Sequence, residues 1–532
     1  KSHHRLMMRS HQPEFYEIKV APADLDDIRV HESLFRSNYG HLKVPFDSLI
    51  LTRRSIDARK GKVVYVLRYQ KVSDVPADNG FHDLTPLADP EHCPQVVVVG
   101  AGPAGYFAAF RLIQSGIRPV VVERGKDVQS RRRDLRAIMQ ESIVNEDSNY
   151  CFGEGGAGTY SDGKLYTRST KRGDVRQILN TFCFYGADPR ILIDANPHIG
   201  TNKLPKIITA MREAILKAGG RILFEHRMVD FDIEDGRLAK VHFRHQPSIE
   251  CKAMILATGH SARDIYRLLA NRGLKIEAKP FAMGVRVEHP QSLIDSIQYS
   301  CPTRPERLPA APYSVVSQEG GRGVFSFCMC PGGMIVPAAT SPGELVVNGM
   351  SPSRRDSPYA NSGFVTSVEL EDIPAEYGED AFVAMNFQSS VEQRLFNYGN
   401  GTQSSPAQRL VDFTRKKEST DLPNCSYVPG IYPAPMHRIL PEFIVDRLIS
   451  GFLSVGKKLH GYLTNEAVVV GVESRTSSPI RIPRDKESLR HPDLVNLFPC
   501  GEGAGYAGGI VSAGIDGVNV AVAVSKYLTM EG

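Results

Sequence analysis

The pattern of apolar and polar positions predicts a buried strand, a helix and a second buried strand within residues 95–123. Every position of the run Val96–Val99 is apolar, which is typical of a strand that is buried on both faces. A helical pattern starts after a short glycine-rich turn, and a second apolar strand, Pro119–Val122, follows it. This order predicts a βαβ unit with two parallel strands.

Further elements of the same kind are predicted on both sides of a long central stretch. They are a helix over Lys203–Ala218, a strand over Arg221–Glu225, a hairpin of Val229–Ile233 and Leu238–Phe243, a buried strand over Ala253–Ala257, a strand over Val495–Pro499 and a helix over Val511–Leu528. Asp235-Gly236 supplies the hairpin turn, because both residue types tolerate positive φ. The last two elements therefore return to the first domain.

The segment before the βαβ unit has a different character. Strands over Phe15–Val20 and Val63–Tyr69, with a helix over Ala23–Ser33 between them, predict a small α+β domain. Residues 74–94 are rich in Pro, Asp and His and predict a linker.

The central stretch, residues 276–480, also differs from the βαβ unit. It contains many short apolar runs that glycine and proline interrupt, and a single helical pattern at Gln403–Lys416. It predicts a mixed, sheet-rich domain inserted into the first one.

The turn after the first strand carries the first candidate chemistry. It reads Gly100-Ala101-Gly102-Pro103-Ala104-Gly105, a G-x-G-x-x-G dinucleotide fingerprint between a strand and a helix. Gly100 allows the tight turn, Gly102 lets the backbone approach a pyrophosphate, and Gly105 lets the helix pack close to the strand. The helix N-terminus favours phosphate through its free N–H groups and its dipole. Glu123 ends the second strand, where an acid holds a ribose hydroxyl.

Three more glycine-rich segments add to this fingerprint. They are Cys151–Leu165, Ala257-Thr258-Gly259-His260, and Gly501-Glu502 with the glycines up to Gly509-Ile510. In the first, Ser161, Asp162 and Lys164 interleave polar groups with glycines that let the backbone approach a ligand. The helix that starts after the last segment offers N–H groups and a dipole, which stabilise negative charge on a reduced flavin.

Together these motifs resemble those of a bacterial family of FAD-dependent dehydrogenases in the NAD(P)/FAD-binding flavoprotein superfamily. Ala257-Thr258-Gly259 resembles the A-T-G segment of FAD-binding chains, and Gly501-Glu502 resembles their G-D segment, with Glu502 in place of the usual Asp. Further matches are Asn196–Thr201, Phe325–Gly333 and Gly471–Thr476. The resemblance implies FAD as the cofactor and a fold of the glutathione-reductase or hydroxylase kind. It implies no substrate.

The predicted fold class is α/β, a Rossmann-like FAD-binding domain with an inserted sheet-rich α+β domain and a small N-terminal α+β domain. The predicted domains are the N-terminal domain at 1–90, the first part of the FAD-binding domain at 95–275, the inserted substrate or cap domain at 276–480, and the C-terminal part of the FAD-binding domain at 481–532. The residues predicted to bind FAD are Gly100, Gly102, Pro103, Ala104, Gly105, Glu123, Arg124, Gly155, Gly156, Gly158, Thr159, Ser161, Asp162, Gly163, Lys164, Val229, Thr258, Gly259, His260, Gly501, Glu502, Gly509, Ile510 and Ser512.

Candidate catalytic residues must lie near the flavin ring, since the flavin carries the redox chemistry. Lys164 follows the glycine-rich loop, where a cation favours reduced flavin, and His260 is a candidate general base. Strand alternation puts Cys328 and Cys330 on one face. On that face they either line a substrate cavity or pack as small core residues. The alternative is that one of them is a redox-active thiol. Disulfide reductases carry C-x-x-C near the first nucleotide motif, and this chain lacks it there.

Charge narrows the possible partners further. The net charge of +5 over 532 residues does not by itself argue for nucleic acid, and we expect none as a partner. One or two members of the basic cluster Arg124–Arg136 are expected to contact phosphate and the rest to form a solvated helix face. Glu473 and Arg475, same-face neighbours in an extended segment, either anchor a polar substrate or form an exposed ion pair.

The cysteine content and the absence of targeting patterns indicate in which cell compartment we expect the protein. Nine cysteines, scattered and without zinc spacing, predict a reducing environment and no metal site. The basic start Lys1–Met8 has no apolar stretch after it, and no run is long enough to span a membrane. We therefore expect a cytoplasmic protein without a membrane partner.

The leading hypothesis is an FAD-dependent dehydrogenase or reductase that acts on a small-molecule organic substrate in the cleft between the FAD-binding domain and the cap. The alternatives are a flavin-dependent monooxygenase and an FAD-containing RNA- or partner-binding protein that uses the N-terminal domain. Only the basic segment Arg53–Lys60 supports the last one. Residues 276–480 contain no second strand–G-x-G-x-x-G–helix unit, so NAD(P)H docks transiently or another electron donor serves.

Overall fold

A five-stranded parallel sheet forms the centre of the nucleotide-binding part of the molecule. The computed structural model describes residues 15–167 and 171–531, so the segment Lys1–Met8 lies outside the described residues. Neighbouring strands are parallel throughout, in the order β22-β10-β4-β5-β6. These strands are β4 (Gln95–Val99), β5 (Arg118–Val122), β6 (Arg221–Leu223), β10 (Met254–Leu256) and β22 (Leu497–Pro499). The predicted βαβ unit and the return of the C-terminal strand to this sheet are confirmed.

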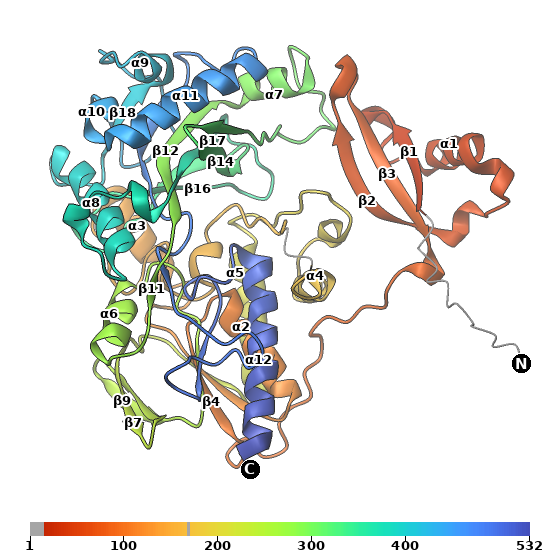
Figure 1. Cartoon of the computed structure of the whole chain (residues 1–532). Coiled ribbons are helices and arrows are strands. Elements are labelled where there is room, and N and C mark those ends of the chain that lie inside the picture. The colour runs from red at the N-terminus through yellow and green to blue at the C-terminus, as the bar shows by residue number, and fades with distance from the viewer. Residues whose placement is uncertain (1–14, 168–170, 532) are drawn as a thin grey trace, which may run out of the picture.

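Helices cover this sheet, and two of them touch backbone to backbone. The helices of this region are α2 (Pro103–Gln114), α3 (Arg131–Glu141), α4 (Val175–Phe184), α5 (Leu204–Lys217), α6 (Arg263–Asn271) and α12 (Ile510–Glu531). The long helix α12 runs beside α2, as Figure 1 shows. An ideal Cβ at Gly517 of α12 would lie 2.1 Å from the carbonyl oxygen of Ala104 in α2. The helices predicted over Lys203–Ala218 and Val511–Leu528 are confirmed as α5 and α12.

Apart from the N-terminal sheet, three smaller sheets accompany the two large ones among the described residues. They are the three-stranded antiparallel sheet of β7 (Met228–Glu234), β8 (Arg237–Phe243) and β9 (Gln246–Glu250), and the pairs β11 (Glu277–Ala278) with β21 (Ile480–Arg481) and β15 (Met334–Pro337) with β16 (Val347–Met350). The predicted hairpin is confirmed. Both of its turn residues, Asp235 and Gly236, have positive φ, of 50° and 73°.

A seven-stranded sheet forms the second large layer and has the order β13-β14-β17-β12-β20-β18-β19. Its strands are β12 (Phe281–Pro290), β13 (Val316–Glu319), β14 (Arg322–Cys330), β17 (Tyr359–Val368), β18 (Ser405–Arg409), β19 (Ile431–Pro433) and β20 (Val468–Glu473). All neighbours are antiparallel except β18 and β19. Its helices are α7 (Gln291–Tyr299), α8 (Val383–Tyr398), α9 (Leu410–Thr414), α10 (Met436–Ile439) and α11 (Glu442–Lys458).

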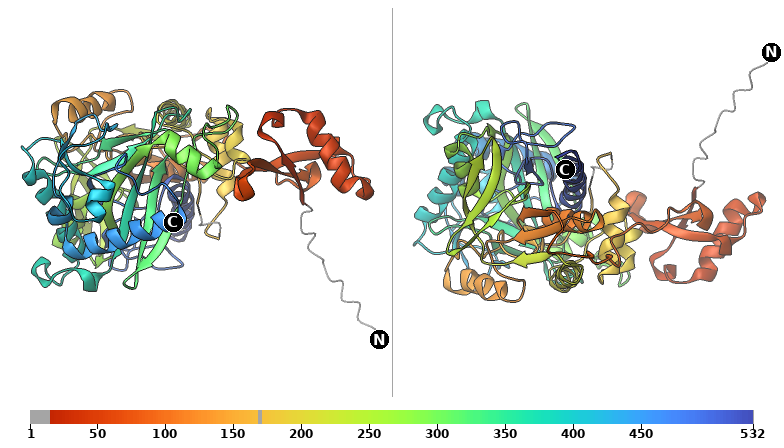
Figure 2. Two further views of the ribbon diagram at one scale, coloured as in Figure 1. Left: turned by 90° about the horizontal axis from the view of Figure 1, so that it is seen from above. Right: turned by 90° about the horizontal axis from the view of Figure 1, so that it is seen from below.

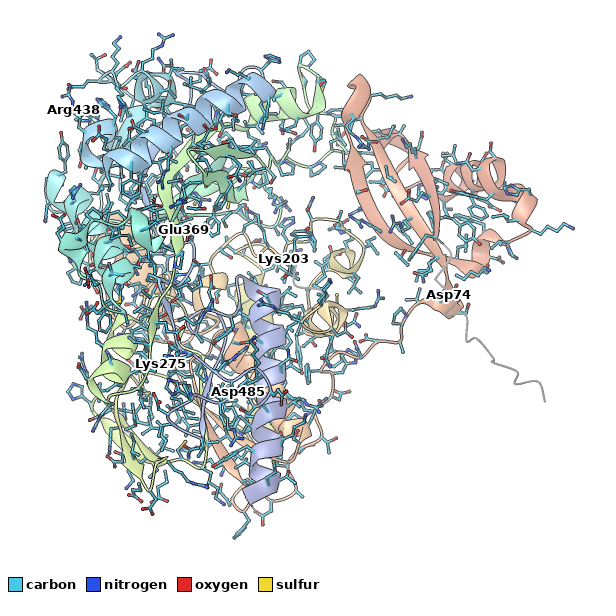
Figure 3. All side chains as sticks on the ribbon, in the orientation of Figure 1. Asp74, Lys203, Lys275, Glu369, Arg438 and Asp485 are labelled. Carbon is cyan, nitrogen blue, oxygen red and sulfur yellow. The ribbon has the colours of Figure 1, made fainter. Side chains whose placement is uncertain are left out.

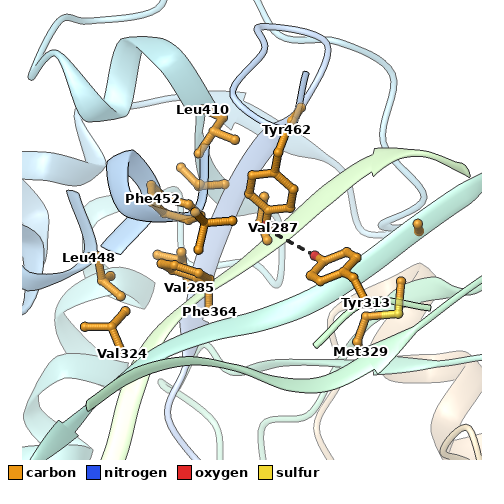
Figure 4. Close-up of a cluster of buried hydrophobic side chains, with 14 of the residues drawn as sticks. Val285, Val287, Tyr313, Val324, Met329, Phe364, Leu410, Leu448, Phe452 and Tyr462 are labelled. Atoms are coloured by element: carbon orange, nitrogen blue, oxygen red, sulfur yellow. Dashed lines mark hydrogen bonds between the residues drawn. The ribbon is translucent and has the colours of Figure 1, made fainter. Parts of the chain in front are cut away.

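An apolar core joins α11 to this sheet. The rings of Phe364 in β17 and Phe452 in α11 are stacked with centroids 3.8 Å apart (Figure 4). The hydroxyl of Tyr462 donates to that of Tyr313 at 3.3 Å beside them. Buried apolar residues of β12 and β14 complete the cluster. This cluster is separate from the core of the parallel sheet and continues into the N-terminal strands through Tyr65, Leu67 and Tyr69, while the exact domain boundaries stay a prediction.

The prediction of a helix over Gln403–Lys416 is wrong. Its first half is the strand β18, which pairs with β20 on one side and β19 on the other, and only the short α9 follows. These two pairings satisfy the backbone of β18 in an extended form, so tertiary structure overrides the local helical pattern. The long helices α8 and α11 were not predicted, although α11 buries a helical stripe that includes Ile444, Leu448 and Phe452.

The N-terminal unit is a three-stranded sheet with one helix and lies to one side of the molecule (Figure 2). Its strands, in the order β1-β3-β2, are β1 (Phe15–Val20), β3 (Val64–Lys71) and β2 (Leu49–Asp57), and its helix is α1 (Ile28–Tyr39). The chain leaves it after Asp74, labelled in Figure 3. The helix starts later than predicted because the side chain of Asp27 caps it by accepting the N–H of Arg29 at 3.0 Å.

The strand β2 was missed because its second half, Arg53–Asp57, belongs to the basic segment Arg53–Lys60. Its guanidinium groups serve contacts within the chain. Arg54 pairs with Asp194 at 2.7 Å and Arg59 with Asp57 at 2.8 Å. The contact with Asp194 leaves the RNA-binding alternative without support from Arg54, whose side chain is largely buried. No described helix combines the length and the apolar character that crossing a bilayer needs.

The contact between α12 and α2 predicts the effect of Gly517→Ala. The added methyl group forces the two backbones apart, and we expect overpacking of about 1–3 kcal/mol in the free energy of unfolding. Thermal unfolding followed by circular dichroism measures the loss. Gly40→Ala is the control, because an ideal Cβ at Gly40 meets nothing within 4 Å. Equal melting temperatures for the two variants would contradict this packing.

Candidate functional site

A cavity of about 440 Å³ lies where the two large sheets meet. The first wall comes from the carboxyl ends of four parallel strands, at Val99, Val122, Ala257 and Cys500. Ligands of open α/β sheets bind at this edge. The opposite wall comes from β14, β16 and the segment after β20, at Phe327, Cys328, Asn348, Arg475 and Thr476.

The fingerprint glycines occupy three different environments. Gly100 has φ 112°, and an ideal Cβ there would lie 2.2 Å from the carbonyl oxygen of Ala257. An ideal Cβ at Gly105 would lie 1.9 Å from the carbonyl oxygen of Gly100, so Gly105 serves the packing of α2 on β4. At Gly102 the nearest atom would be the Cα of Gly156, 3.9 Å away. The space in front of Gly102 is therefore open to the cavity.

Glu123, predicted to hold a ribose, ties three backbone segments together. Its Oε1 accepts the N–H groups of Gly125 at 2.9 Å and Gly153 at 3.0 Å, and its Oε2 accepts the N–H of Ala101 at 3.0 Å. A carboxylate oxygen has two acceptor positions. Oε2 uses one of them in these bonds and keeps the other for a ligand in the cavity that Glu123 lines.

Arg131 organises the glycine-rich loop, which the sequence did not reveal. The side chain is fully buried, and all its hydrogen bonds go to loop carbonyl groups. Nε donates to Asn149 at 2.8 Å, Nη2 to Tyr150 at 2.9 Å, and Nη1 to Glu154 at 2.8 Å and Gly156 at 3.0 Å. The expectation that this residue belongs to a phosphate site or a solvated face is wrong, because its guanidinium satisfies a buried irregular backbone.

Arg124, predicted to contact the cofactor, belongs to a charged cluster beside the cavity. Its guanidinium pairs with Asp147 and Asp264, each at 2.9 Å, and lies over the ring of Phe152. Arg227 pairs with the same two acids. Sequence reasoning missed Asp147, Asp264 and Arg227, because they are far apart in the chain and only the fold brings them together.

Most of the predicted cofactor residues line the one cavity. Those that do are Gly100, Gly102, Pro103, Ala104, Glu123, Arg124, Gly156, Gly158, Ser161, Asp162, Gly163, Lys164, Thr258, Gly259, His260, Gly501, Glu502, Gly509 and Ile510. Four motifs that are far apart in the sequence therefore meet in one place.

The structure does not bring five of the predicted residues to the cavity wall. Gly105 packs α2, while Gly155 and Thr159 lie at a smaller neighbouring void. Val229 is 41% exposed, and its strand neighbour Met228 lines the cavity instead, since side chains alternate along a strand. The hydroxyl of Ser512 donates to the carbonyl of Gly508 at 2.8 Å and accepts the N–H of Gly508 at 3.0 Å, so it is engaged by the turn before α12.

The two candidate cysteines sit in a β-bulge. The register of β14 against β17 shifts between Phe327 and Cys330, and Cys328 has φ 46°. Simple alternation therefore fails, and the argument that both cysteines face one way is wrong. Cys328 lines the cavity and Cys330 is fully buried behind it. Lys164 reaches them from the glycine-rich loop, with Nζ 4.0 Å from the Sγ of Cys328.

Among the titratable groups at the cavity, His260 and Glu502 have shifted pKa values that bear on proton transfer. Burial and the positive charges of Arg475 and Arg263 lower the pKa of His260 to about 4. A base of that pKa is poorly matched to proton abstraction near neutral pH, so His260 serves best as a neutral hydrogen-bonding group. Burial raises the pKa of Glu502 to about 7, against the opposing charge of Lys279.

Glu473 and Arg475 do not form an exposed pair, so that expectation is wrong. Both are buried, and each pairs with other residues. Glu473 pairs with Arg286 at 2.8 Å. Arg475 pairs with Glu344 at 2.6 Å and with Glu392 at 3.0 Å. Arg263 of α6 pairs with the same two acids. This buried network ties the nucleotide-binding part to the seven-stranded sheet beside the cavity.

Comparisons with known proteins match both parts of this arrangement. The family model described as "FAD-dependent protein, C-terminal domain-like" matches residues 280–476. The model "Pyridine nucleotide-disulphide oxidoreductase" matches residues 94–265. An "Uncharacterized protein" of Clostridium beijerinckii is 37% identical over 517 residues, which are 93% of this chain and 96% of that protein.

Solved structures resemble this chain only distantly. Tetracycline destructase Tet(55) is 11% identical, with a TM-score of 0.35 over 82% of this chain and 81% of that one. A geranylgeranyl bacteriochlorophyll reductase-like protein of Thermoplasma acidophilum is 13% identical, with a TM-score of 0.35 over 82% and 80%. Likeness at this level carries no argument about the activity of this chain.

The cavity lining fits the FAD that the first family model implies. The backbone at Gly102 leaves open space at the N-terminus of α2, which suits a pyrophosphate. The remaining acceptor position of Glu123 suits a ribose hydroxyl. The start of α12, with Gly509 and Ile510 in the wall, suits the electron-rich edge of a flavin.

The hydrogen bonds of Arg131 predict that Arg131→Met disrupts the site. Four loop carbonyl groups lose their buried donor, and we expect a loss of at least roughly 3 kcal/mol in the free energy of unfolding. Bound flavin, measured by absorbance, should fall with it. Arg133→Met is the matched control, since Arg133 is exposed on the same helix. Wild-type flavin content and stability in Arg131→Met would contradict the assigned role.

Proposed function

This chain belongs to a family of FAD-dependent proteins and is an FAD-dependent oxidoreductase, and we propose that it is a dehydrogenase or reductase of a small organic substrate. The observation that carries the proposal is the single cavity in which four separated glycine-rich motifs meet residues of the seven-stranded sheet. Bound FAD supplies two-electron redox chemistry there.

We assign the cofactor contacts to the cavity wall nearer the parallel sheet. Gly102 and the first turn of α2 hold the pyrophosphate, and Glu123 holds the adenosine ribose. The start of α12 and Glu502 hold the flavin end. The ion pairs of Arg124 and Arg227 with Asp264 close the cavity wall near Glu123. In this proposal the chain binds and orients FAD with backbone groups and needs few side chains.

The opposite wall supplies the substrate site. Cys328, Asn348 and Arg475 of this wall offer a thiol, an amide and a guanidinium toward the cavity. Arg475 is held by Glu344 and Glu392, so its position is fixed before a substrate arrives. Such a wall suits a small polar organic molecule, and the buried network excludes water from behind it.

The topology of residues 276–480 limits how an electron donor can bind. This stretch forms a mostly antiparallel sheet, and its described part holds no strand–glycine turn–helix unit that could bind a second dinucleotide. NAD(P)H then docks only transiently, or another electron donor serves. Exposing the reduced protein to oxygen in the presence of substrate tests the monooxygenase alternative. Hydroxylation of the substrate would favour a monooxygenase over a dehydrogenase or reductase.

Paired glycine substitutions test where FAD binds. Gly102→Val fills the open space of the pyrophosphate, so we expect a folded protein that purifies without its yellow colour. Gly105→Val clashes with the backbone of Gly100, so we expect both flavin content and melting temperature to fall. Acid release from the wild type should yield FAD and not FMN. Full flavin occupancy in Gly102→Val would exclude this loop as the phosphate site.

The missing second nucleotide site predicts slow reduction by NADH and NADPH. We expect the observed rate of flavin reduction to rise almost linearly with nucleotide concentration, since no preformed site saturates. Anaerobic stopped-flow absorbance measures it. Saturation at micromolar concentrations of either nucleotide would contradict the prediction.

A further inference from the structure

The thiols of Cys328 and Cys330 form a compact pair at the substrate wall. Cys328 lines the cavity, and the Sγ of Cys330 donates to the carbonyl oxygen of Cys328 at 3.3 Å. The two side chains also hydrogen-bond to each other. Both are free thiols. The outer thiol thus has access to a ligand, while the inner one has access only to its partner.

The backbone at Cys328 is strained in a way that aims this thiol at the cavity. A non-glycine residue with positive φ is uncommon, and Cys328 adopts it inside the β14 bulge. Bulges re-aim side chains and are frequent next to active sites, and strain of this kind persists only where the surrounding structure imposes it. If Cys328 served only to pack the core, ordinary strand geometry would have been enough.

Two cations hold the pair. Lys164 Nζ lies 4.0 Å from the Sγ of Cys328 and donates to the carbonyl oxygen of Met329. Arg286 Nη2 lies 2.6 Å from the carbonyl oxygen of Cys328 and 3.5 Å from the Sγ of Cys330. Gly349 leaves room for this guanidinium, because an ideal Cβ there would lie 2.0 Å from Nη2.

This environment favours a thiolate at Cys328. The hydrogen bond from Cys330, with the charges of Lys164 and Arg286, brings the pKa of Cys328 well below its usual range despite burial. The hydrogen bond to Cys328 and burial raise the pKa of Cys330. The charged groups that act on the pair are Lys164, Arg286, Asp162, Glu473 and Glu502. The outer sulfur is therefore the nucleophile and the inner one carries the proton.

We propose that Cys328 and Cys330 are a redox-active thiol pair, which makes a small disulfide the substrate class of this oxidoreductase. The inference deepens the proposed function and rests on it, because the substrate enters the same cavity. It also differs from the packing role that the sequence favoured for these residues.

The exchange balances in two steps. The Cys328 thiolate attacks one sulfur of R–S–S–R, which forms a Cys328–S–S–R bond and releases RS⁻. Cys330 gives up its proton to the solvent or to the released thiolate, attacks the Cys328 sulfur, and releases the second RS⁻. The pair loses two electrons and the substrate becomes two thiols. Return to the dithiol takes two electrons and two protons, and reduced FAD is the two-electron reductant that this protein carries.

The first test measures the reactivity of each cysteine in the purified, full-length protein. Iodoacetamide labelling at a series of pH values, with peptide mass spectrometry, gives a rate for every thiol. We expect Cys328 to react with a midpoint well below that of an ordinary thiol, while the buried Cys251 and Cys500, whose pKa values burial raises, stay unlabelled. Lys164→Met should raise the Cys328 midpoint by roughly one pH unit or more, and Lys164→Arg should restore it.

The second test uses cystamine and oxidised glutathione as probes. We expect the wild type to form a Cys328–Cys330 disulfide, seen as the loss of two hydrogens. Cys330→Ser should accumulate the mixed disulfide on Cys328, and Cys328→Ser should form none at Cys330. Cys93→Ser, a thiol outside the cavity, is the control that should behave as the wild type. Circular dichroism and flavin absorbance are recorded for each variant.

The outcomes distinguish a failure of the proposed thiol pair from a failure of the proposed function. A Cys328 midpoint near 8.5, the value of an ordinary thiol, would overturn the thiol pair even if FAD is fully bound. Equal mixed-disulfide formation at Cys151, which lines the same cavity, would overturn it too. Absence of FAD from a protein whose Cys328 still titrates well below an ordinary thiol would instead overturn the proposed function. The wild-type labelling profile decides the matter even if a variant fails to fold.

Discussion

The site depends on the hydrogen bonding of a buried loop whose only regular secondary structure is the 3-10 turn Gly156–Gly158. Residues 149–158 are largely buried and line the cavity at Cys151, Phe152 and Gly156, so their backbone groups cannot all reach water. The guanidinium of Arg131 satisfies four of the carbonyl groups, and the carboxylate of Glu123 satisfies an N–H of the loop and one from each of two neighbouring turns. Since unsatisfied buried backbone groups are costly, these two side chains fix the loop in one shape.

That shape determines where the other parts can lie. The loop places Gly156 3.9 Å from an ideal Cβ at Gly102, and the segment that follows it brings Lys164 to the bulge of β14. The Arg263–Glu344–Glu392–Arg475 network then fixes the seven-stranded sheet against the same cavity. A buried ionic network of this kind is weak evidence for stability, because desolvation offsets its attraction. Its role here is to define the position of Arg475 and the distance between the two walls.

Local patterns predicted the nucleotide-binding part well, and the reason is physical. A strand buried on both faces, a glycine turn and a helix cap leave strong signals within a few residues, so Gly100, Gly102 and Glu123 were found. Arg131 could not be found in this way, because an arginine in a charged run of the sequence is expected to be exposed to solvent. Its hydrogen bonds to the loop form only once the loop is folded over it. The β14 bulge also escaped, since one extra residue leaves no mark in the sequence yet changes which way Cys328 points. The strand β18 was mistaken for a helix because its pairing partners are distant in the chain.

The central claim is that one preorganised cavity binds FAD along the parallel sheet and leaves the Cys328 wall to the substrate. A crystal structure of the purified, yellow protein tests it most directly. The account predicts electron density for FAD with its pyrophosphate at Gly102, its ribose at the Oε2 of Glu123, and the 149–158 loop held by Arg131. Density for FAD elsewhere, or a loop that has left Arg131 on binding it, would contradict the account.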